Sequence, residues 1–368
     1  MQVRLREAPE WVSLSFSDRP KIGWFCGYTP LEVLLAAGFV PVRVSGHTGS
    51  VSKADSCLHA NMCHYVRSAL DAALNGAYDE LKGAVFVNSC DAMRRLYDVW
   101  RKHVNMDFTF LLDLPRGQSE EDVAYYQNEI QKLRNAISAH FSVDITDKQI
   151  KAAAHIYSEG RDQYKALNDL RRETPPRISG YDIANMAALF SSTSPEKWGA
   201  YALTLTTEKS EQSAPAVKRL RMILDGSPVH NPEVISFIED CGFDVVAENF
   251  CSGSRHFDLN TGKPNTGDIL HDLSAAYLAR PPCARMMRFE ERAARLIDIV
   301  KTFGAHGVIH ISLKFCDTYL YDVPRLRKKL AAEGIRSLFL ETDGTIGSIG
   351  QLKTRIEAFA EMIGGDAL

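Results

Sequence analysis

Residues 83–115, GAVFVNSCDAMRRLYDVWRKHVNMDFTFLLDLP, contain an apolar run, a stretch of helical period and a second apolar run. Residues 307–344, GVIHISLKFCDTYLYDVPRLRKKLAAEGIRSLFLETDG, repeat this order. Both segments place Cys-Asp after the first run, Tyr-Asp-Val in the helix, and an aspartate after the second run (Asp113 and Asp343). Strands that alternate with helices of this length predict parallel βαβ units, and the shared motifs predict two duplicated lobes.

The segments before these two also resemble each other. Residues 23–44 (GWFCGYTPLEVLLAAGFVPVRV) and 221–249 (RMILDGSPVHNPEVISFIEDCGFDVVAEN) both suggest strand, turn, helix carrying Glu-Val, Gly-Phe and strand. We therefore predict an α/β fold of two Rossmann-like parallel-sheet lobes, related by internal duplication, with an α-helical segment between them. The predicted parts are an N-terminal lead (1–20), the first lobe (21–117), the helical segment (118–215) and the second lobe (216–368).

Two helix starts are predicted from capping residues. In the first lobe Thr29 would be the N-cap, Pro30 the first helical residue and Glu32 the partner in a capping box. In the helical segment, where strand signals are almost absent, Thr146 and Gln149 form a second capping box.

Composition narrows the class of protein. A net charge of −3 over 368 residues gives no reason to expect a nucleic acid or an anionic membrane as partner. No apolar run reaches the length of a membrane span, and the N-terminus lacks the apolar core of a signal peptide. We expect a cytoplasmic protein, in which cysteines serve metal binding or catalysis more often than disulfides.

Six of the eight cysteines occupy matching positions in the two halves. Cys90 and Cys316 each end an apolar run, and Cys63 and Cys283 each precede the helix before that run. Cys26 and Cys251 end two further strand-like runs. The carboxyl ends of parallel strands form the sites of open α/β sheets, so six thiols there predict a metal centre. Thiolates select zinc, copper(I) or iron–sulfur clusters, and dispersed cysteines without a Cys-x-x-Cys pair favour the cluster.

Packing is the alternative for each cysteine, because a free cysteine commonly behaves as a small buried hydrophobe. Cys57 and Cys241 are interpreted in this way. For Cys63, Cys90 and Cys316 considered together the metal-ligand interpretation is preferred, and for Cys26, Cys251 and Cys283 both interpretations stay open. Arg255, in CSGSR, could bind an anion or form a surface salt bridge.

Across nearly its whole length the chain resembles the benzoyl-CoA reductase / 2-hydroxyacyl-CoA dehydratase family (the D-component, or cluster-bearing subunits). The resemblance is carried by the following segments: GWFCGYTPLEVLLAAGFVPVRV, ADSCLHANMCHYVRSALD, NSCDAMRRLYDVW, LDLPR, ENFCSGSRHF, RPPCARM, KFCD and ETDGTIGSIGQLKTRIEAF. It implies a [4Fe–4S] cluster held by Cys63, Cys90 and Cys316 between the lobes. It also implies an ATPase activator, itself an iron–sulfur protein, that supplies one low-potential electron. The substrate would be an acyl-CoA thioester, which is dehydrated at a 2-hydroxyacyl group or reduced at an aromatic one.

Three additional cysteines depart from that simple pattern. One branch of the family carries a double-cubane [8Fe–9S] cluster, and the chain resembles this branch at Cys26, Cys251 and Cys283; such proteins look like reductases of small molecules. A non-catalytic electron-transfer protein or a metal-stabilised scaffold is the third interpretation. The sequence leaves open the substrate, the catalytic acid and base, and whether the chain forms a homodimer or pairs with a paralogous subunit.

Overall fold

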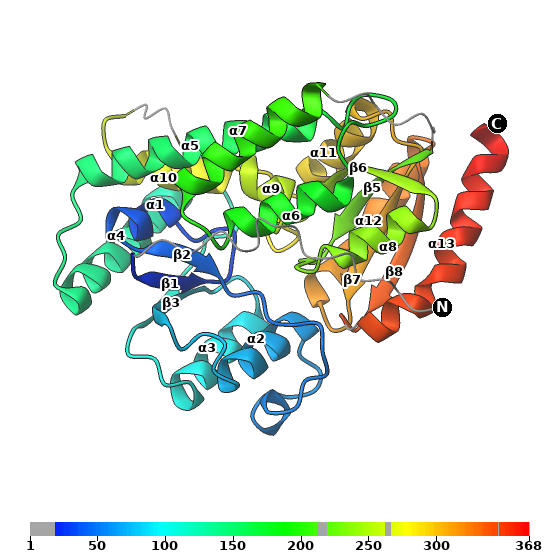
Figure 1. Cartoon of the computed structure of the whole chain (residues 1–368). Helices are drawn as coiled ribbons and strands as arrows, with labels where there is room; N and C mark the ends of the chain where they lie inside the picture. Colours follow the sequence, from blue (N-terminus) through cyan, green and yellow to red (C-terminus); the bar gives the residue numbers. More distant parts are fainter. Residues whose placement is uncertain (1–18, 212–218, 262–265, 345, 368) are drawn as a thin grey trace.

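The structure is a computed structural model that describes residues 19–211, 219–261, 266–344 and 346–367. The predicted N-terminal lead therefore lies almost wholly outside the described residues. Two four-stranded parallel sheets form the framework (Figure 1). The first has the order β2-β1-β3-β4 and the second the order β6-β5-β7-β8, so both share one topology. The predicted fold class, α/β with two Rossmann-like parallel-sheet lobes, is confirmed.

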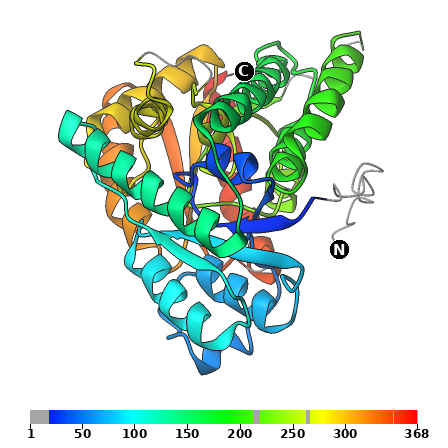
Figure 2. The same cartoon turned by 90° about the vertical axis from the view of Figure 1, so that its left-hand side faces the viewer.

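The first lobe alternates strands with helices as the sequence pattern predicts. Its elements are β1 (Lys21–Trp24), α1 (Leu31–Ala36), β2 (Val40–Arg43), the 3₁₀ turn η2 (Ala54–Ser56), α2 (His64–Leu74), β3 (Leu81–Val87), α3 (Asp91–His103) and β4 (Thr109–Leu112). Helices α2 and α3 cover one face of the sheet, and α1 lies on the other (Figures 1 and 2). Burial on both faces explains the nearly continuous apolar runs of these strands.

Four helices follow without an intervening strand, as expected for the middle of the chain. They are α4 (Glu120–Phe141), α5 (Asp147–Asp169), α6 (Gly180–Phe190) and α7 (Pro195–Glu211). The Thr146–Gln149 capping box at the start of α5 is confirmed. Helix α5 packs on α1 and α7, while α6 packs on β6 and α8, so these helices connect the two lobes above the first sheet (Figure 1).

The second lobe repeats the first with longer strands. Its elements are β5 (Leu220–Gly226), α8 (Glu233–Asp240), β6 (Phe243–Asn249), α9 (Ser254–Phe257), α10 (Ile269–Ala279), α11 (Phe289–Thr302), β7 (Gly307–Leu313), α12 (Asp317–Ala332), β8 (Arg336–Thr342) and α13 (Ile346–Ala367). Helix α10 packs on α4 and shares a hydrophobic core with the first lobe. The halves of the chain are therefore interlocked, and the exact domain boundaries stay a prediction.

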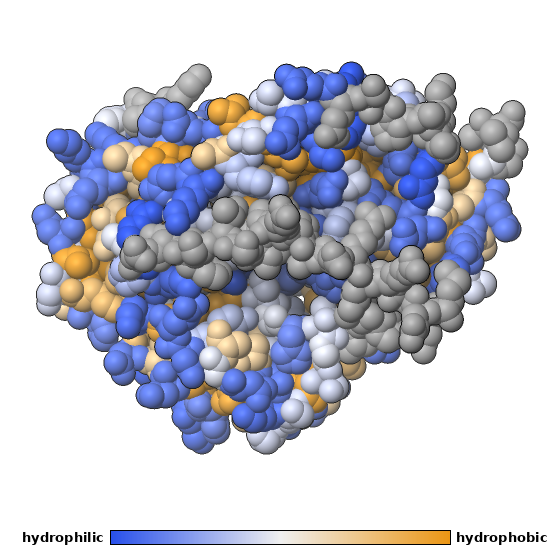
Figure 3. Space-filling model, in the orientation of Figure 1, coloured by the Kyte–Doolittle hydropathy of each residue, from blue (hydrophilic) through white to orange (hydrophobic). Residues whose placement is uncertain are grey.

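No helix in the described ranges combines the length and the apolar character needed to cross a membrane. In the face shown in Figure 3, hydrophobic residues form scattered groups among hydrophilic ones.

The capping box predicted at Thr29 and Glu32 is wrong. Helix α1 begins at Leu31 with Pro30 as its N-cap, and no side chain caps it. Glu32 is instead fully buried, and its carboxylate pairs with the Arg161 guanidinium at 2.8 Å. It also accepts hydrogen bonds from Thr261 at 3.2 Å and from Tyr277 at 2.7 Å. A buried carboxylate needs such partners, and this need outweighs local capping.

Because Glu32 joins α1 to α5 and α10, its removal should destabilise the whole fold. We predict that Glu32→Ala lowers the free energy of unfolding by about 3–5 kcal/mol, since it leaves Arg161 charged and buried without its partner. The exposed pair of Glu333 with Lys301 provides the control, for which Glu333→Ala should cost about 1 kcal/mol or less. Urea unfolding of both variants measures the difference, and equal costs would contradict this role of Glu32.

Candidate metal centre

All six cysteines singled out from the sequence line one cavity between the lobes. The cavity measures about 100 Å³, and its apolar wall includes Phe25, Tyr28, Leu114 and Leu313. We call it the cysteine cavity; its thiols belong to Cys26, Cys63, Cys90, Cys251, Cys283 and Cys316. Neither Cys57 nor Cys241 lines it. Cys57 lies in the loop before α2 and Cys241 at the C-terminal end of α8, positions that agree with a packing role.

Three of the thiols share one local geometry, because each of their residues is the N-cap of a helix. Cys63 precedes α2, Cys90 precedes α3 and Cys316 precedes α12. None of the three side chains forms a capping hydrogen bond. The backbone N–H group three residues further along the helix nevertheless acts to lower the pKa of each thiol. A helix N-terminus favours negative charge, so these positions suit thiolate ligands.

The other three thiols come from loops that meet the first set across the cavity. Cys26 lies two residues beyond β1, Cys251 two residues beyond β6, and Cys283 between α10 and α11. The convergence depends on the parallel topology, which brings the carboxyl ends of strands in both sheets to the same region. Cys283 depends in addition on α10 and its packing against the first lobe.

The mutual effects on pKa show which thiols lie near one another. The pKa of Cys63 is raised to about 12, mainly by burial and with contributions from Cys316 and Cys90. Burial likewise raises the pKa of Cys26 to about 12, with contributions from Cys283 and Cys251. Charges act strongly on pKa values only over short distances, so these thiols are neighbours. Besides burial, Cys283 raises the pKa of Cys90 and of Cys316, so it lies near thiols that come from both lobes.

Arg43 gives Cys251 a distinct environment. Burial raises the pKa of the Cys251 thiol, but Arg43 and Arg255 outweigh it and hold the pKa below its ordinary value. Arg43 Nη2 donates to Cys251 Sγ at 3.5 Å, and Nη1 donates to the Cys251 carbonyl at 2.9 Å. Since Arg43 ends β2 in the first lobe, this contact also joins the two lobes.

Positive charge gathers at the cysteine cavity without matching carboxylates. Arg43, Arg255 and Arg285 line the cavity, and none of them forms an ion pair with a carboxylate of the described residues. Each also has a buried Nε atom without a hydrogen-bond partner in the described chain. Arg255 is 2% exposed and donates to the Tyr319 hydroxyl at 2.5 Å, which excludes the surface salt bridge considered from the sequence.

Buried arginines elsewhere in the protein either pair with a carboxylate or, like Arg221 and Arg280, donate to backbone carbonyl groups. Arg171 contacts Glu248 at 2.7 Å, and Arg292 forms a two-pronged pair with Asp322. Buried charges are costly unless compensated, so the gathering of three arginines around the thiols of one cavity favours an anionic occupant.

The residues present fit an iron–sulfur cluster. Among the described residues no three His, Cys, Asp or Glu side chains converge closely enough to hold a single metal ion. The thiols are instead spread over the cavity wall, and the irons of a cluster each take their own cysteine ligand. An apolar wall, several thiols and nearby N–H donors are the features by which proteins hold such a cluster and set its potential.

Sequence comparison agrees with this geometry. The family model for the D-component of 2-hydroxyglutaryl-CoA dehydratase matches residues 26–363. The chain belongs to this family. It is 28% identical over 361 residues to the (R)-phenyllactyl-CoA dehydratase beta subunit of Clostridium sporogenes, covering 93% of this chain and 91% of that protein. It is 24% identical over 367 residues to a benzoyl-CoA reductase subunit of Thauera aromatica, covering 94% and 91%. The family resemblance inferred from the motifs is thus confirmed.

A second, larger pocket adjoins the cysteine cavity. It measures about 320 Å³ and is lined by residues 45–48, His64, Tyr65 and Ser68 of the first lobe together with residues of the second lobe. We call it the inter-lobe pocket. Tyr65, Pro228 and Leu313 line both the pocket and the cavity, so the two spaces adjoin at these residues.

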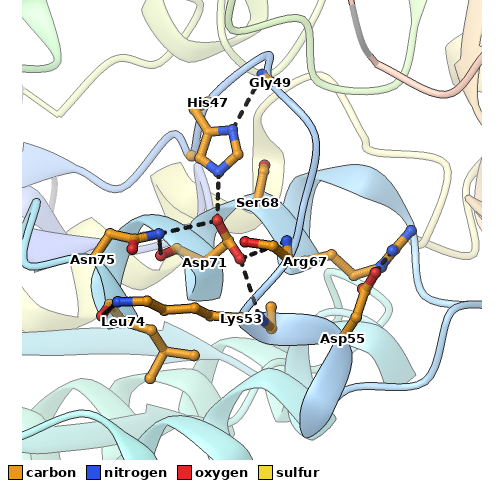
Figure 4. Close-up of polar contacts among 12 residues, drawn as sticks. His47, Gly49, Lys53, Asp55, Arg67, Ser68, Asp71, Leu74 and Asn75 are labelled. Atoms are coloured by element: carbon orange, nitrogen blue, oxygen red, sulfur yellow. Dashed lines mark hydrogen bonds and ion pairs between the residues drawn. The ribbon is translucent and has the colours of Figure 1, made fainter.

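One wall of the inter-lobe pocket is fixed by Asp71 on α2 (Figure 4). Its carboxylate accepts hydrogen bonds from His47 Nε2 at 3.1 Å and from the N–H groups of Ser52 and Ala54 at 2.9 and 3.1 Å. Burial raises the pKa of Asp71, but these N–H donors outweigh it and hold the pKa below its usual value. Asp71 therefore stabilises residues 47–54 as long as it is ionised.

This stabilisation should depend on pH. Because the folded pKa of Asp71 is lowered, its contribution is present above the unfolded pKa, about 3.9, and is lost as the pH falls through the folded value. We predict that Asp71→Asn reduces the free energy of unfolding at neutral pH and that this difference shrinks below about pH 4. Urea unfolding across this range tests it, with the exposed Asp55→Asn as control. A pH-independent difference would contradict the assignment.

Proposed function

We propose that this chain is the cluster-bearing component of an ATP-activated, low-potential one-electron reductase or dehydratase that acts on acyl-CoA thioesters. Cys63, Cys90 and Cys316 would hold an iron–sulfur cluster in the cysteine cavity, at three helix N-termini. The cluster would supply electrons at low potential to a substrate whose bonds do not react without reduction. The observation that carries the proposal is six thiols and three uncompensated arginines around one cavity.

The relatives support the acyl-CoA part of the proposal. Their names describe subunits of a phenyllactyl-CoA dehydratase, a lactoyl-CoA dehydratase and a benzoyl-CoA reductase. In this proposal a separate ATPase activator, itself an iron–sulfur protein, delivers the electron. The chain then works as a homodimer or with a paralogous subunit in the cytoplasm.

The second candidate is a double-cubane [8Fe–9S] reductase of small molecules. It is favoured by one specific observation: Cys26, Cys251 and Cys283 line the same cavity as the other three cysteines. Charge favours it as well. Two [4Fe–4S]²⁺ cubanes with a bridging sulfide and six thiolates carry about −4, whereas one such cubane with three thiolates carries about −1. The larger negative charge compensates the three arginines more fully.

Iron and sulfide analysis of anaerobically purified protein separates the candidates. We expect about four irons per chain for the single cubane and about eight for the double one. Cys90→Ser and Cys316→Ser should each abolish the cluster, because each removes a ligand at a helix N-terminus. Cys283→Ser should be nearly silent with a single cubane and should lose about half of the iron with a double cubane.

Cys241→Ser is the matched control, since Cys241 lies at the end of α8 and outside the cysteine cavity. It should keep the full iron content. Full iron in Cys90→Ser or Cys316→Ser would overturn the ligand assignment. Zinc in place of iron would overturn both candidates and leave the scaffold interpretation.

The arginines should affect the reduction potential of the cluster. A reduced cluster is more negative than an oxidised one, and Arg43 stabilises negative charge through its own charge and its N–H···S contact. We predict that Arg43→Met shifts the midpoint potential to a more negative value and that Arg43→Lys shifts it less. A redox titration monitored by EPR measures the shift.

Arg95→Met serves as the control, because Arg95 is exposed on α3 and pairs with Asp91. Its midpoint potential should equal that of the unmodified protein. An unchanged potential in Arg43→Met at full iron content would show that Arg43 does not act on the cluster.

A further inference from the structure

The inter-lobe pocket differs in charge from the cysteine cavity beside it. No Lys, Arg, Asp or Glu is among the described residues that line it. Its wall is mainly apolar, with Val234, Phe237, Ile238, Ile311 and Leu340 among the contributors. The polar remainder consists mainly of hydroxyl groups and three histidines, His47, His64 and His230. The pocket is thus suited to a small molecule that is largely apolar.

The histidines do not make the pocket a cationic site by their geometry. Burial together with Arg43 holds the pKa of His230 well below its ordinary value. His47 Nδ1 accepts a hydrogen bond from the Gly49 N–H at 3.2 Å, so its proton lies on Nε2, which donates to Asp71 (Figure 4). A carboxylate entering the pocket would lose water and meet no Lys or Arg side chain among the described residues that line it, which is costly.

One polar atom of the wall lacks a partner. His230 Nε2 is buried and has no hydrogen-bond partner in the described chain, while its ring stacks on Tyr65 at 4.6 Å. Buried polar atoms are nearly always hydrogen-bonded, so this nitrogen is suited to a group on a bound molecule. Tyr65 lines both spaces, so a ligand contacting His230 lies next to the cysteine cavity.

The pocket walls are also closely fitted before any ligand arrives. Gly46 has φ +75°, and a Cβ there would lie 2.3 Å from Ser68 Oγ. Gly344 has φ +80°, and a Cβ there would lie 2.7 Å from the His64 ring. Such close approaches hold the loops of both lobes against α2, so the pocket is preformed.

We propose that the inter-lobe pocket binds a small uncharged molecule, or the uncharged end of a larger one, that is mostly apolar and hydrogen-bonds His230 Nε2. The pocket discriminates against carboxylate-bearing analogues. That the bound molecule is the one reduced in the adjoining cavity rests on the proposed function, whereas its binding does not.

Two probes of one shape test the proposal, 3-phenylpropanamide and 3-phenylpropanoate. In calorimetric titrations of the full chain purified anaerobically, we expect the amide to bind at least about tenfold more tightly than the carboxylate, because only the carboxylate must lose charge hydration. His230→Phe should weaken amide binding. Val234→Arg should weaken it further and favour the carboxylate, since it adds a cation to the wall.

Leu203→Arg, on the exposed face of α7, is the control and should leave binding of both probes unchanged. The proposal is overturned if the amide does not bind at millimolar concentration, or if both pocket variants leave its affinity unchanged. It is also overturned if the carboxylate binds equally well in a His230-dependent manner. Iron content is measured on the same samples, so a failure of the pocket is distinguished from a failure of the proposed cluster.

Discussion

Uncompensated positive charge inside the cysteine cavity is the constraint on which this account depends. Arg43, Arg255 and Arg285 gather around one cavity without carboxylate partners in the described chain, whereas Arg161, Arg171 and Arg292 are each paired. Arg221 and Arg280, which are also buried, donate to backbone carbonyl groups. A buried guanidinium without a counter-charge costs free energy that the fold must recover elsewhere. A cluster held by thiolates provides that counter-charge, so cluster and arginines stabilise each other. The same charges then favour the reduced state, which connects the stability of the site with its redox chemistry.

The duplicated topology explains how one cavity obtains six thiols. Parallel strands in both sheets bring their carboxyl ends together, and three helices begin there with a cysteine as N-cap. Helix α10 packs on the first lobe, and Cys283 follows this helix. Arg43 and Glu32 then join the halves, Arg43 at the cavity and Glu32 in the core. The same junction leaves the inter-lobe pocket, which shares Tyr65, Pro228 and Leu313 with the wall of the cavity.

The sequence predicted the fold class and all six cysteines that line the cavity, because strand–helix alternation and repeated Cys-Asp motifs are local patterns. Predictions from the sequence failed where contacts between distant segments determine the structure. Glu32 matched the pattern of a capping box, but its carboxylate pairs with Arg161 instead. Helix α10 packs on the first lobe, although it belongs to the second lobe in the sequence. Arg43, Arg285 and His230 were missed, since a single residue does not reveal its long-range partner. Only Arg43 had a usable signal, a charged residue ending an otherwise buried strand.

The central claim is that the cysteine cavity holds an anionic iron–sulfur cluster. Its most direct test is a crystal structure of the anaerobically purified protein, with anomalous diffraction recorded on both sides of the iron absorption edge. The account predicts iron peaks inside the cavity, bonded to Cys63, Cys90 and Cys316 and, for a double cubane, also to Cys26, Cys251 and Cys283. Iron absent from the cavity of a protein shown by analysis to contain it, or a lone zinc ion there, would contradict the account.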